Sequence, residues 1–135
     1  MSTENNKSEY LIIFRGSHWD KGLSAEELQK VTSQFMAWFE RLKQEGTAKA
    51  GQPLEREGKI VSGKKGRNVA DGPFAESKEA IGGYFLLQVA DIDEAVAIAQ
   101  QCPILDYGAT VEVRPVAAEC VSMRRAQEQL AAATA

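Results

Sequence analysis

Tyr10-Leu11-Ile12-Ile13-Phe14 is a run of five apolar residues, and Gly16 and a polar loop follow it. A short continuous run of this kind predicts a buried strand. Because no polar residue interrupts the run, both faces of the strand are expected to be covered. The polar residues before it, 1–8, predict a flexible N-terminal tail.

A helix is predicted next, over residues 24–45. Ser24 and Glu27 have the spacing of a capping box. Gly46 stands where a left-handed residue often ends a helix. Apolar residues recur at helical spacing between these ends, at Leu28, Val31, Phe35, Trp38 and Leu42. We interpret this aromatic stripe as core packing rather than as a platform on which a ligand stacks.

The remaining chain predicts the other half of a sandwich. Residues 47–70 are rich in turn signals and predict short strands at 48–52, 59–62 and 67–70, with a protruding hairpin in this region. Residues 84–89 and 109–113 predict two more strands, and a helix begins at Asp91 and ends before Pro103. The Ala-rich residues 117–135 predict a C-terminal helix or tail.

This order predicts the fold class. Strand, helix, strand with hairpin, strand, helix and strand form the ferredoxin-like α+β pattern, βαββαβ, with an extra β-hairpin and a C-terminal helix. Such a chain has a four-stranded antiparallel sheet with both helices on one face.

The other face of that sheet predicts a homodimer. A face without helices is expected to be polar, yet residues 10–14 are all apolar, and Tyr84 and Leu86 lie opposite Phe85 and Leu87. An apolar sheet face usually marks an interface, and a second copy related by a two-fold axis covers it. The alternative is that the C-terminal helix folds across this face.

Composition limits the function classes. The 135 residues suit one domain, and the net charge of −3 argues against a nucleic-acid partner, which needs a basic face. No apolar run approaches the ~20 residues that span a membrane, and the polar N-terminus resembles no signal peptide. We therefore predict a cytoplasmic protein without membrane contact. Cys102 and Cys120 form no metal-binding pattern, so we predict two reduced thiols and no metal.

One stretch resembles a known family. It runs Val69-Ala70-Asp71-Gly72-Pro73-Phe74-Ala75-Glu76-Ser77-Lys78-Glu79 and continues with Ile81-Gly82-Gly83-Tyr84. With the later stretches 91–95 and 108–115, and the layout of residues 10–51, it is similar to the DGPF branch of the YCII-related family. The resemblance covers about residues 9–116, which we take as the domain, with 117–135 as its C-terminal extension.

The resemblance implies a dimeric α/β barrel made of two ferredoxin-like subunits. Relatives in the wider superfamily include small-molecule enzymes that work without cofactors, and some DGPF members are encoded beside sigma factors. Family members also carry a histidine in the first helix that pairs with an aspartate as an acid–base dyad. Residues 24–45 contain no histidine, so the dyad cannot be transferred to this chain.

Asp71 and His18 are the candidate catalytic residues. Asp71 follows a predicted strand, and desolvation beside the apolar face would raise its pKa into the range of a general base. The alternative is an aspartate that only shapes the Gly72-Pro73 turn. His18 is the one histidine of the chain, and histidine titrates near neutral pH; an exposed loop histidine is the alternative.

The candidate substrate-binding residues surround this pair: Trp19, Tyr84, Phe74 and Pro73. Tyr84 has a simpler interpretation as an interface aromatic, and Phe74 as a core plug. Gly63-Lys64-Lys65-Gly66-Arg67 lacks the spacing of a phosphate-binding loop, so we interpret it as a solubilising tip, with contact to an anion or an acidic partner as the alternative.

Two functions follow as hypotheses. The first is a small-molecule binder, with a cofactor-free acid–base activity of the lyase or isomerase type on Asp71 and His18. The second is a non-catalytic regulatory or interaction module linked to sigma-factor-dependent transcription, with a transcription-related protein as its partner. Neither hypothesis requires a cofactor.

Overall fold

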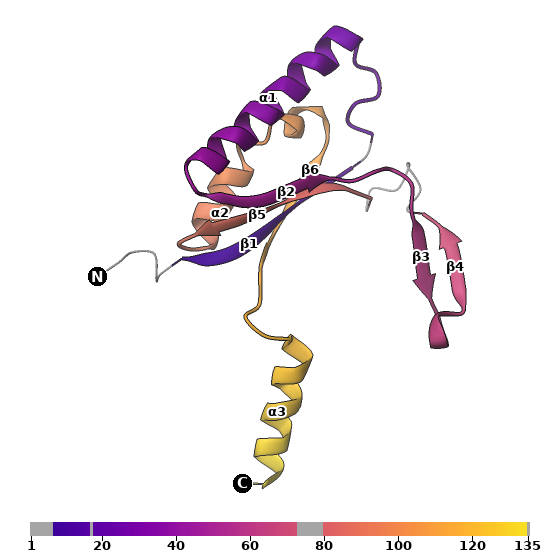
Figure 1. Cartoon of the computed structure of the whole chain (residues 1–135), viewed down its shortest axis with the longest axis vertical. Coiled ribbons are helices and arrows are strands. Elements are labelled where there is room, and N and C mark those ends of the chain that lie inside the picture. Colours follow the sequence, from indigo (N-terminus) through magenta and orange to yellow (C-terminus); the bar gives the residue numbers. More distant parts are fainter. Residues whose placement is uncertain (1–6, 17, 73–79, 135) are drawn as a thin grey trace.

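The computed structural model of the chain describes residues 7–16, 18–72 and 80–134. Its elements follow the predicted order (Figure 1). They are β1 (Ser8–Arg15), α1 (Ala25–Gln44), β2 (Ala48–Pro53), β3 (Lys59–Ser62), η2 (Lys64–Gly66), β4 (Asn68–Asp71), β5 (Ile81–Val89), α2 (Ile92–Ala99), η3 (Pro103–Tyr107), β6 (Thr110–Pro115) and α3 (Val121–Thr134). The extra hairpin and the C-terminal helix are therefore confirmed.

The main sheet has the ferredoxin-like strand order. It runs β2-β5-β1-β6, and each neighbouring pair is antiparallel. The helices α1 and α2 cover one face of this sheet (Figure 1). β3 and β4 form a separate two-stranded hairpin. The α+β class and the topology predicted from the sequence are confirmed.

Both ends of α1 are held by the local sequence. The Ser24 hydroxyl accepts a hydrogen bond from the Glu27 amide, and the Glu27 carboxylate accepts one from the Ser24 amide, which completes the capping box. At the other end the Thr47 amide donates to the Leu42 carbonyl and the Gly46 amide to the Lys43 carbonyl. These two bonds make a Schellman motif, for which Gly46 adopts a φ of +78°.

The core lies between the helices and the sheet. Alternate residues of β1 and β5 face it, including Ile12, Phe14, Phe85 and Leu87, which are all buried. Their sequence neighbours point to the other face, where no helix packs. On that face Ile13 is only 8% exposed, and Leu11 and Leu86 are half-buried.

Trp38 joins the two helices across the core. Its indole Nε1 donates a 3.0 Å hydrogen bond to Oε1 of Gln101, just after α2, and Arg41 donates to the same oxygen at 3.2 Å. Trp38 is 3% exposed, so water has little access to its N–H. The Gln101 oxygen therefore satisfies a polar group that α1 carries into the core.

We expect Gln101→Ala to lower the free energy of unfolding by about 1–3 kcal/mol, because it leaves the buried indole N–H without a partner. Urea unfolding followed by circular dichroism measures the change. Gln100→Ala is the matched control, since this neighbour is exposed, and its effect should stay within about 0.5 kcal/mol. Equal effects of the two substitutions would contradict the role given to the bond.

The two cysteines differ in exposure and are not bonded to each other. Cys102 is buried at the end of α2, and burial raises the pKa of its thiol from 9.0 to about 11. The reactive form of cysteine is the thiolate. Cys120, just before α3, is exposed.

We expect one thiol per native chain to react rapidly with a disulfide reagent such as DTNB at pH 8. The raised pKa leaves Cys102 almost entirely protonated at that pH, so only Cys120 reacts. Both thiols should react once the chain is unfolded in guanidinium. A Cys120→Ser variant that still reacted rapidly in the native state would show that Cys102 is accessible.

Candidate functional site

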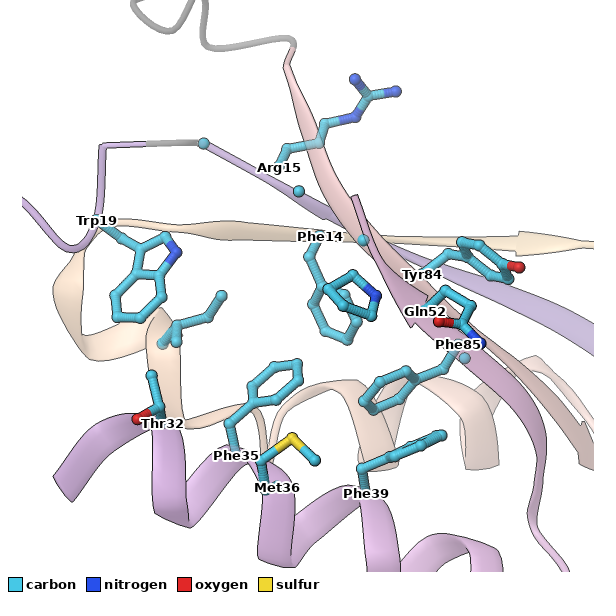
Figure 2. A pocket seen from close by; sticks show the side chains of 16 residues that line it. Phe14, Arg15, Trp19, Thr32, Phe35, Met36, Phe39, Gln52, Tyr84 and Phe85 are labelled. Carbon is cyan, nitrogen blue, oxygen red and sulfur yellow. The ribbon is translucent and has the colours of Figure 1, made fainter. Parts of the chain in front are cut away.

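A cleft of about 310 Å³ opens between α1 and the sheet (Figure 2). Apolar side chains from both layers form most of its lining. They are Phe14, Trp19, Phe35, Met36, Phe39, Pro53, Phe85 and Ile104. The helix contributes three of these side chains at positions 35, 36 and 39, on the edge of its apolar stripe.

The aromatic rings of the cleft are in mutual contact. Phe39 stacks on Phe85 with ring centroids 4.4 Å apart, and Phe14 meets Phe85 edge to face at 4.7 Å. Phe35 meets Phe14 edge to face at 5.1 Å. Such pairs favour particular ring orientations in addition to burying apolar area. Phe35 and Phe39 are only half-buried. Phe35 belongs to the stripe predicted as core packing, so part of that stripe also lines the cleft.

Backbone without side chains forms part of the opposite wall. Gly51 on β2 and Gly83 on β5 both line the cleft. A Cβ at Gly51 would lie 2.8 Å from ring atoms of Phe39 and Phe85, and one at Gly83 would lie 2.9 Å from the Gln52 carbonyl oxygen. The two glycines therefore allow the rings and the neighbouring strand to approach this closely.

The charged and polar groups of the lining are few. Among the described lining residues, Arg15 carries the charge, and Thr32, Gln52 and Tyr84 carry the polar side-chain atoms. Figure 2 shows the side chains of Arg15 and Tyr84 turned away from the ring cluster. The Thr32 hydroxyl donates within its own helix, to the Leu28 carbonyl at 2.8 Å. The cleft is therefore largely apolar.

Of the predicted His18-Trp19 pair, Trp19 belongs to the described lining of the cleft, whereas His18, in the same turn, does not. The turn that carries Trp19 is closed by a hydrogen bond from the Lys21 amide to the His18 carbonyl. Asp20 forms an ion pair with Arg56, which ties this turn to the segment after β2. Two side-chain atoms here, His18 Nε2 and Asp20 Oδ1, are buried without a hydrogen-bond partner in the described structure. Such atoms are a costly exception in folded proteins.

Asp71 lies elsewhere in the structure. It ends β4 on the hairpin, its side chain is 78% exposed, and its carboxylate pairs with the Lys59 ammonium. It does not belong to the described lining of the cleft. The desolvation expected for a general base is therefore absent at Asp71 within the single chain, because the strand before it belongs to the hairpin and not to the main sheet.

The other predicted binding residues are placed as follows. Tyr84 borders the cleft through its position on β5, while strand alternation puts its ring on the helix-free face beside Ile13. Pro73 and Phe74 lie outside the described residues. Phe35, Met36 and Phe39 were missed as site residues, since a helical apolar stripe reads as core from its spacing alone. Within the described ranges, no group of three His, Cys, Asp or Glu side chains is placed to hold a metal ion.

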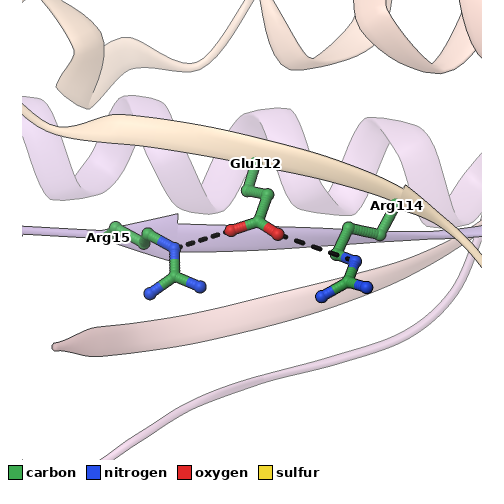
Figure 3. Close-up of polar contacts among 3 residues, drawn as sticks. All are labelled: Arg15, Glu112 and Arg114. Carbon is green, nitrogen blue, oxygen red and sulfur yellow. Dashed lines mark hydrogen bonds and ion pairs between the residues drawn. The ribbon is translucent and has the colours of Figure 1, made fainter. Parts of the chain in front are cut away.

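The helix-free face carries a charged cluster besides its apolar residues (Figure 3). Arg15 Nε contacts one Glu112 oxygen at 2.7 Å, and Arg114 Nε lies 3.7 Å from the other. The Arg15 and Glu112 side chains are about one-third exposed. This face is thus mixed in character, with Leu11, Ile13 and Leu86 beside the cluster.

Fold and cleft together define a ferredoxin-like α+β domain with an aromatic cleft between its first helix and its sheet. The chain belongs to the YCII-related family: the family's sequence profile, described as the YCII-related domain, matches residues 10–131. The family resemblance predicted from the sequence is confirmed. The matched region extends through most of α3.

The chain is similar to proteins known from sequence and from solved structures. An uncharacterized protein of Rhizobium meliloti (strain 1021) is 42% identical over 50 residues, 36% of this chain, and the match spans 40% of that relative's length. The 5-chloro-2-hydroxyhydroquinone dehydrochlorinase (TftG) of Burkholderia phenoliruptrix AC1100, solved with 2,5-dihydroxybenzoquinone, has 17% sequence identity and a TM-score of 0.43. That match covers 77% of this chain and 90% of the dehydrochlorinase chain. Among the described residues, no helix has the length and apolarity to cross a membrane.

We expect Gly51→Ala to destabilise the fold by about 1–3 kcal/mol, the usual cost of an added methyl group in a packed site. The added Cβ meets Phe85, which is buried and cannot move aside. Thermal and urea unfolding measure the change. Gly82→Ala, on the neighbouring strand β5, is the control, because its Cβ would lie 3.9 Å from the nearest atom. If both variants unfold like wild type, the close approach at Gly51 is not a constraint.

Proposed function

We propose that this protein binds a small, flat, largely apolar molecule in the cleft between α1 and the sheet. The observation that supports this most is the preformed aromatic surface of the cleft, in which Phe35 and Phe39 of α1 contact Phe14 and Phe85 of the sheet. Ligand sites are typically concave, mostly apolar and preformed, with a few polar groups. The cleft has each of these features.

The size of the cleft suits a small ligand. Its volume of about 310 Å³ lies at the lower end of the roughly 300–1,000 Å³ range of small-molecule sites. Flat rings fit the walls best, since the edges and faces of the four phenylalanine rings offer edge-to-face and stacked contacts. A ligand with one or two aromatic rings is therefore favoured.

A polar group on that ligand is favoured beside Trp19. Trp19 lines the cleft, and in the same turn His18 Nε2 and Asp20 Oδ1 are buried without partners among the described residues. An unpaired buried polar atom costs about 1–3 kcal/mol. A hydroxyl or carbonyl group on the ligand, directly or through water, would relieve that cost. In this proposal His18 acts as a binding residue beside Trp19.

Binding has more support than the acid–base scheme on Asp71 and His18. The Asp71 carboxylate is exposed and paired with Lys59, and no carboxylate belongs to the described cleft lining. We further propose that the protein works in the cytoplasm as a homodimer, with the helix-free faces of two copies together. The half-buried Leu11 and Leu86 beside the nearly buried Ile13 support this pairing. A transcription-linked regulatory role stays a prediction.

The test is binding of 2-naphthol, which has two flat rings and one hydroxyl. We expect its titration to change the fluorescence of Trp19 in wild type and to raise the melting temperature, since a ligand of the native state stabilises it by mass action. Thr32→Phe places a ring at the exposed rim of the cleft and should weaken binding at least tenfold. Ser33→Phe, on the next position of α1 and outside the lining, should bind like wild type.

Two further variants separate binding from chemistry. Asp71→Asn should leave 2-naphthol affinity unchanged, because the carboxylate lies outside the described cleft lining. Trp38→Phe should keep the fluorescence response, whereas Trp19→Phe should lose it. If 2-naphthol and naphthalene both fail to bind at millimolar concentration, the proposed ligand class is wrong.

A further inference from the structure

Two elements of the chain project from the domain as arms. The hairpin β3–β4 follows the edge strand β2, and α3 follows the opposite edge strand β6. Both extend on the side of the sheet away from α1 and α2 (Figure 1). Every described residue of β3, β4 and α3 is exposed. The arms therefore border the helix-free face without packing on it.

Neither arm is stable by its own means. A two-stranded hairpin alone is marginal in water, and so is an isolated helix shorter than about 12–15 residues; α3 has 14. Both arms also expose apolar side chains: more than half of the surface of Val61, Val69, Met123 and Leu130 is accessible. The arms thus need a surface to pack against.

We propose that α3 of one copy packs against the β3–β4 hairpin of a second copy. The inference rests on the proposed homodimer with its helix-free faces together. The arm contact adds a second contact region to the interface. In this arrangement α3 packs on the partner copy and not on its own sheet.

The area of the sheet face supports this. Four strands of about six residues present a face on the order of 400 Å², from the ordinary strand spacing and rise. A stable interface buries about 800 Å² on each partner. The sheet face alone supplies roughly half of that area, so a stable dimer needs further buried surface. The two arms border the sheet face and expose apolar side chains, so they can supply it.

The topology brings the two arms together. β2 and β6 run in opposite directions because each step from β2 through β5 and β1 to β6 is antiparallel. Each arm leaves at the carboxyl end of its strand, so the arms leave at diagonally opposite corners of the sheet. Consider two copies stacked face to face, with a two-fold axis between them that is parallel to both sheets. If the axis runs along the diagonal through the two corners without arms, α3 of one copy lies at the hairpin corner of the second.

This arrangement is a known packing mode. The strands of the two sheets then cross near 90°, which is one of the two common ways in which sheets pack. A helix of 14 residues is about 21 Å long, twice the roughly 10 Å between stacked sheets. α3 is therefore long enough to run alongside the partner's hairpin, which extends from the partner's sheet toward the first copy.

The contacting surfaces have matching lengths. Met123, Ala126 and Leu130 lie on one side of α3, at positions i, i+3 and i+7. Val61 and Val69 are cross-strand partners on one face of the hairpin. Seven helical residues span about 10 Å, close to the roughly 13 Å of a four-residue strand. The α3 stripe thus covers the hairpin face.

Sedimentation of the full chain tests the proposal. We expect Leu130→Asp on α3 and Val61→Asp on the hairpin each to raise the dimer dissociation constant at least tenfold. Ala132→Asp, on the opposite side of α3, and Ser62→Asp, on the opposite face of the hairpin, are the matched controls and should change it less than twofold. A dimer that is unaffected by both apolar substitutions overturns the proposal while leaving the sheet pairing intact.

Cross-linking decides whether the contact lies between copies. In a Cys120→Ser background, one variant carries Val69→Cys and another carries Met123→Cys. After subunit exchange and oxidation, the mixture should give more covalent dimer than either variant alone. A chain that carries both cysteines and forms only an internal disulfide overturns the proposal, as does the absence of any covalent dimer.

These experiments also distinguish the arm contact from the homodimer and the ligand proposals. A wild-type chain that is monomeric at micromolar concentration refutes the homodimer and the arm contact together. If a chain that forms the cross-link does not bind 2-naphthol, the ligand proposal alone is wrong. Binding of 2-naphthol by the Leu130→Asp variant is expected, because α3 does not belong to the described cleft lining.

Discussion

The packing of the Phe85 ring is the contact on which the rest of this domain depends. Phe85 sits in the central strand β5, is 4% exposed, and meets the rings of Phe35, Trp38 and Phe39 from α1 at centroid distances of 5.5, 5.2 and 4.4 Å. It also meets Phe14 of β1. One side chain therefore fixes the helix on the sheet and shapes the floor of the cleft.

The same contact explains why the neighbouring strand carries a glycine. Gly51 pairs with Phe85 across the β2–β5 ladder, and the space a Cβ would need is filled by Phe39 and Phe85. Without a side chain at this position, the Phe39 ring comes down onto the sheet. The half-exposed edges of Phe35 and Phe39 then face solvent as a wall. The cleft is thus a consequence of how the core closes at one end of α1, and stability and binding share the same rings.

The sequence predicts the fold well because its signals are local. The capping box at Ser24 and the glycine at Gly46 fix the ends of α1 through hydrogen bonds within a few residues. The alternation in β5 and β6 fixes which side chains face the helices. The lining of the cleft could not be predicted in this way, since it depends on Gly51 and Phe39 meeting across two elements. The sequence predicts Asp71 near the apolar sheet face because it follows a predicted strand. Among the described residues, however, that strand pairs only with β3, which spacing along the chain does not reveal.

The helix-free face shows how apolar and charged groups share one surface. Ile13 lies between Tyr84 and Glu112 in the strand register, and it is 8% exposed. The ion pair of Arg15 with Glu112 is already partly shielded, at 28% and 33% exposure. Covering it further with a second sheet removes water from both charges, which is favourable only if their hydrogen bonds stay satisfied. In the proposed homodimer, this cluster would add specificity more than affinity to the sheet-to-sheet interface. The exposed apolar side chains of the hairpin and α3 are the surface that the proposed arm contact would add.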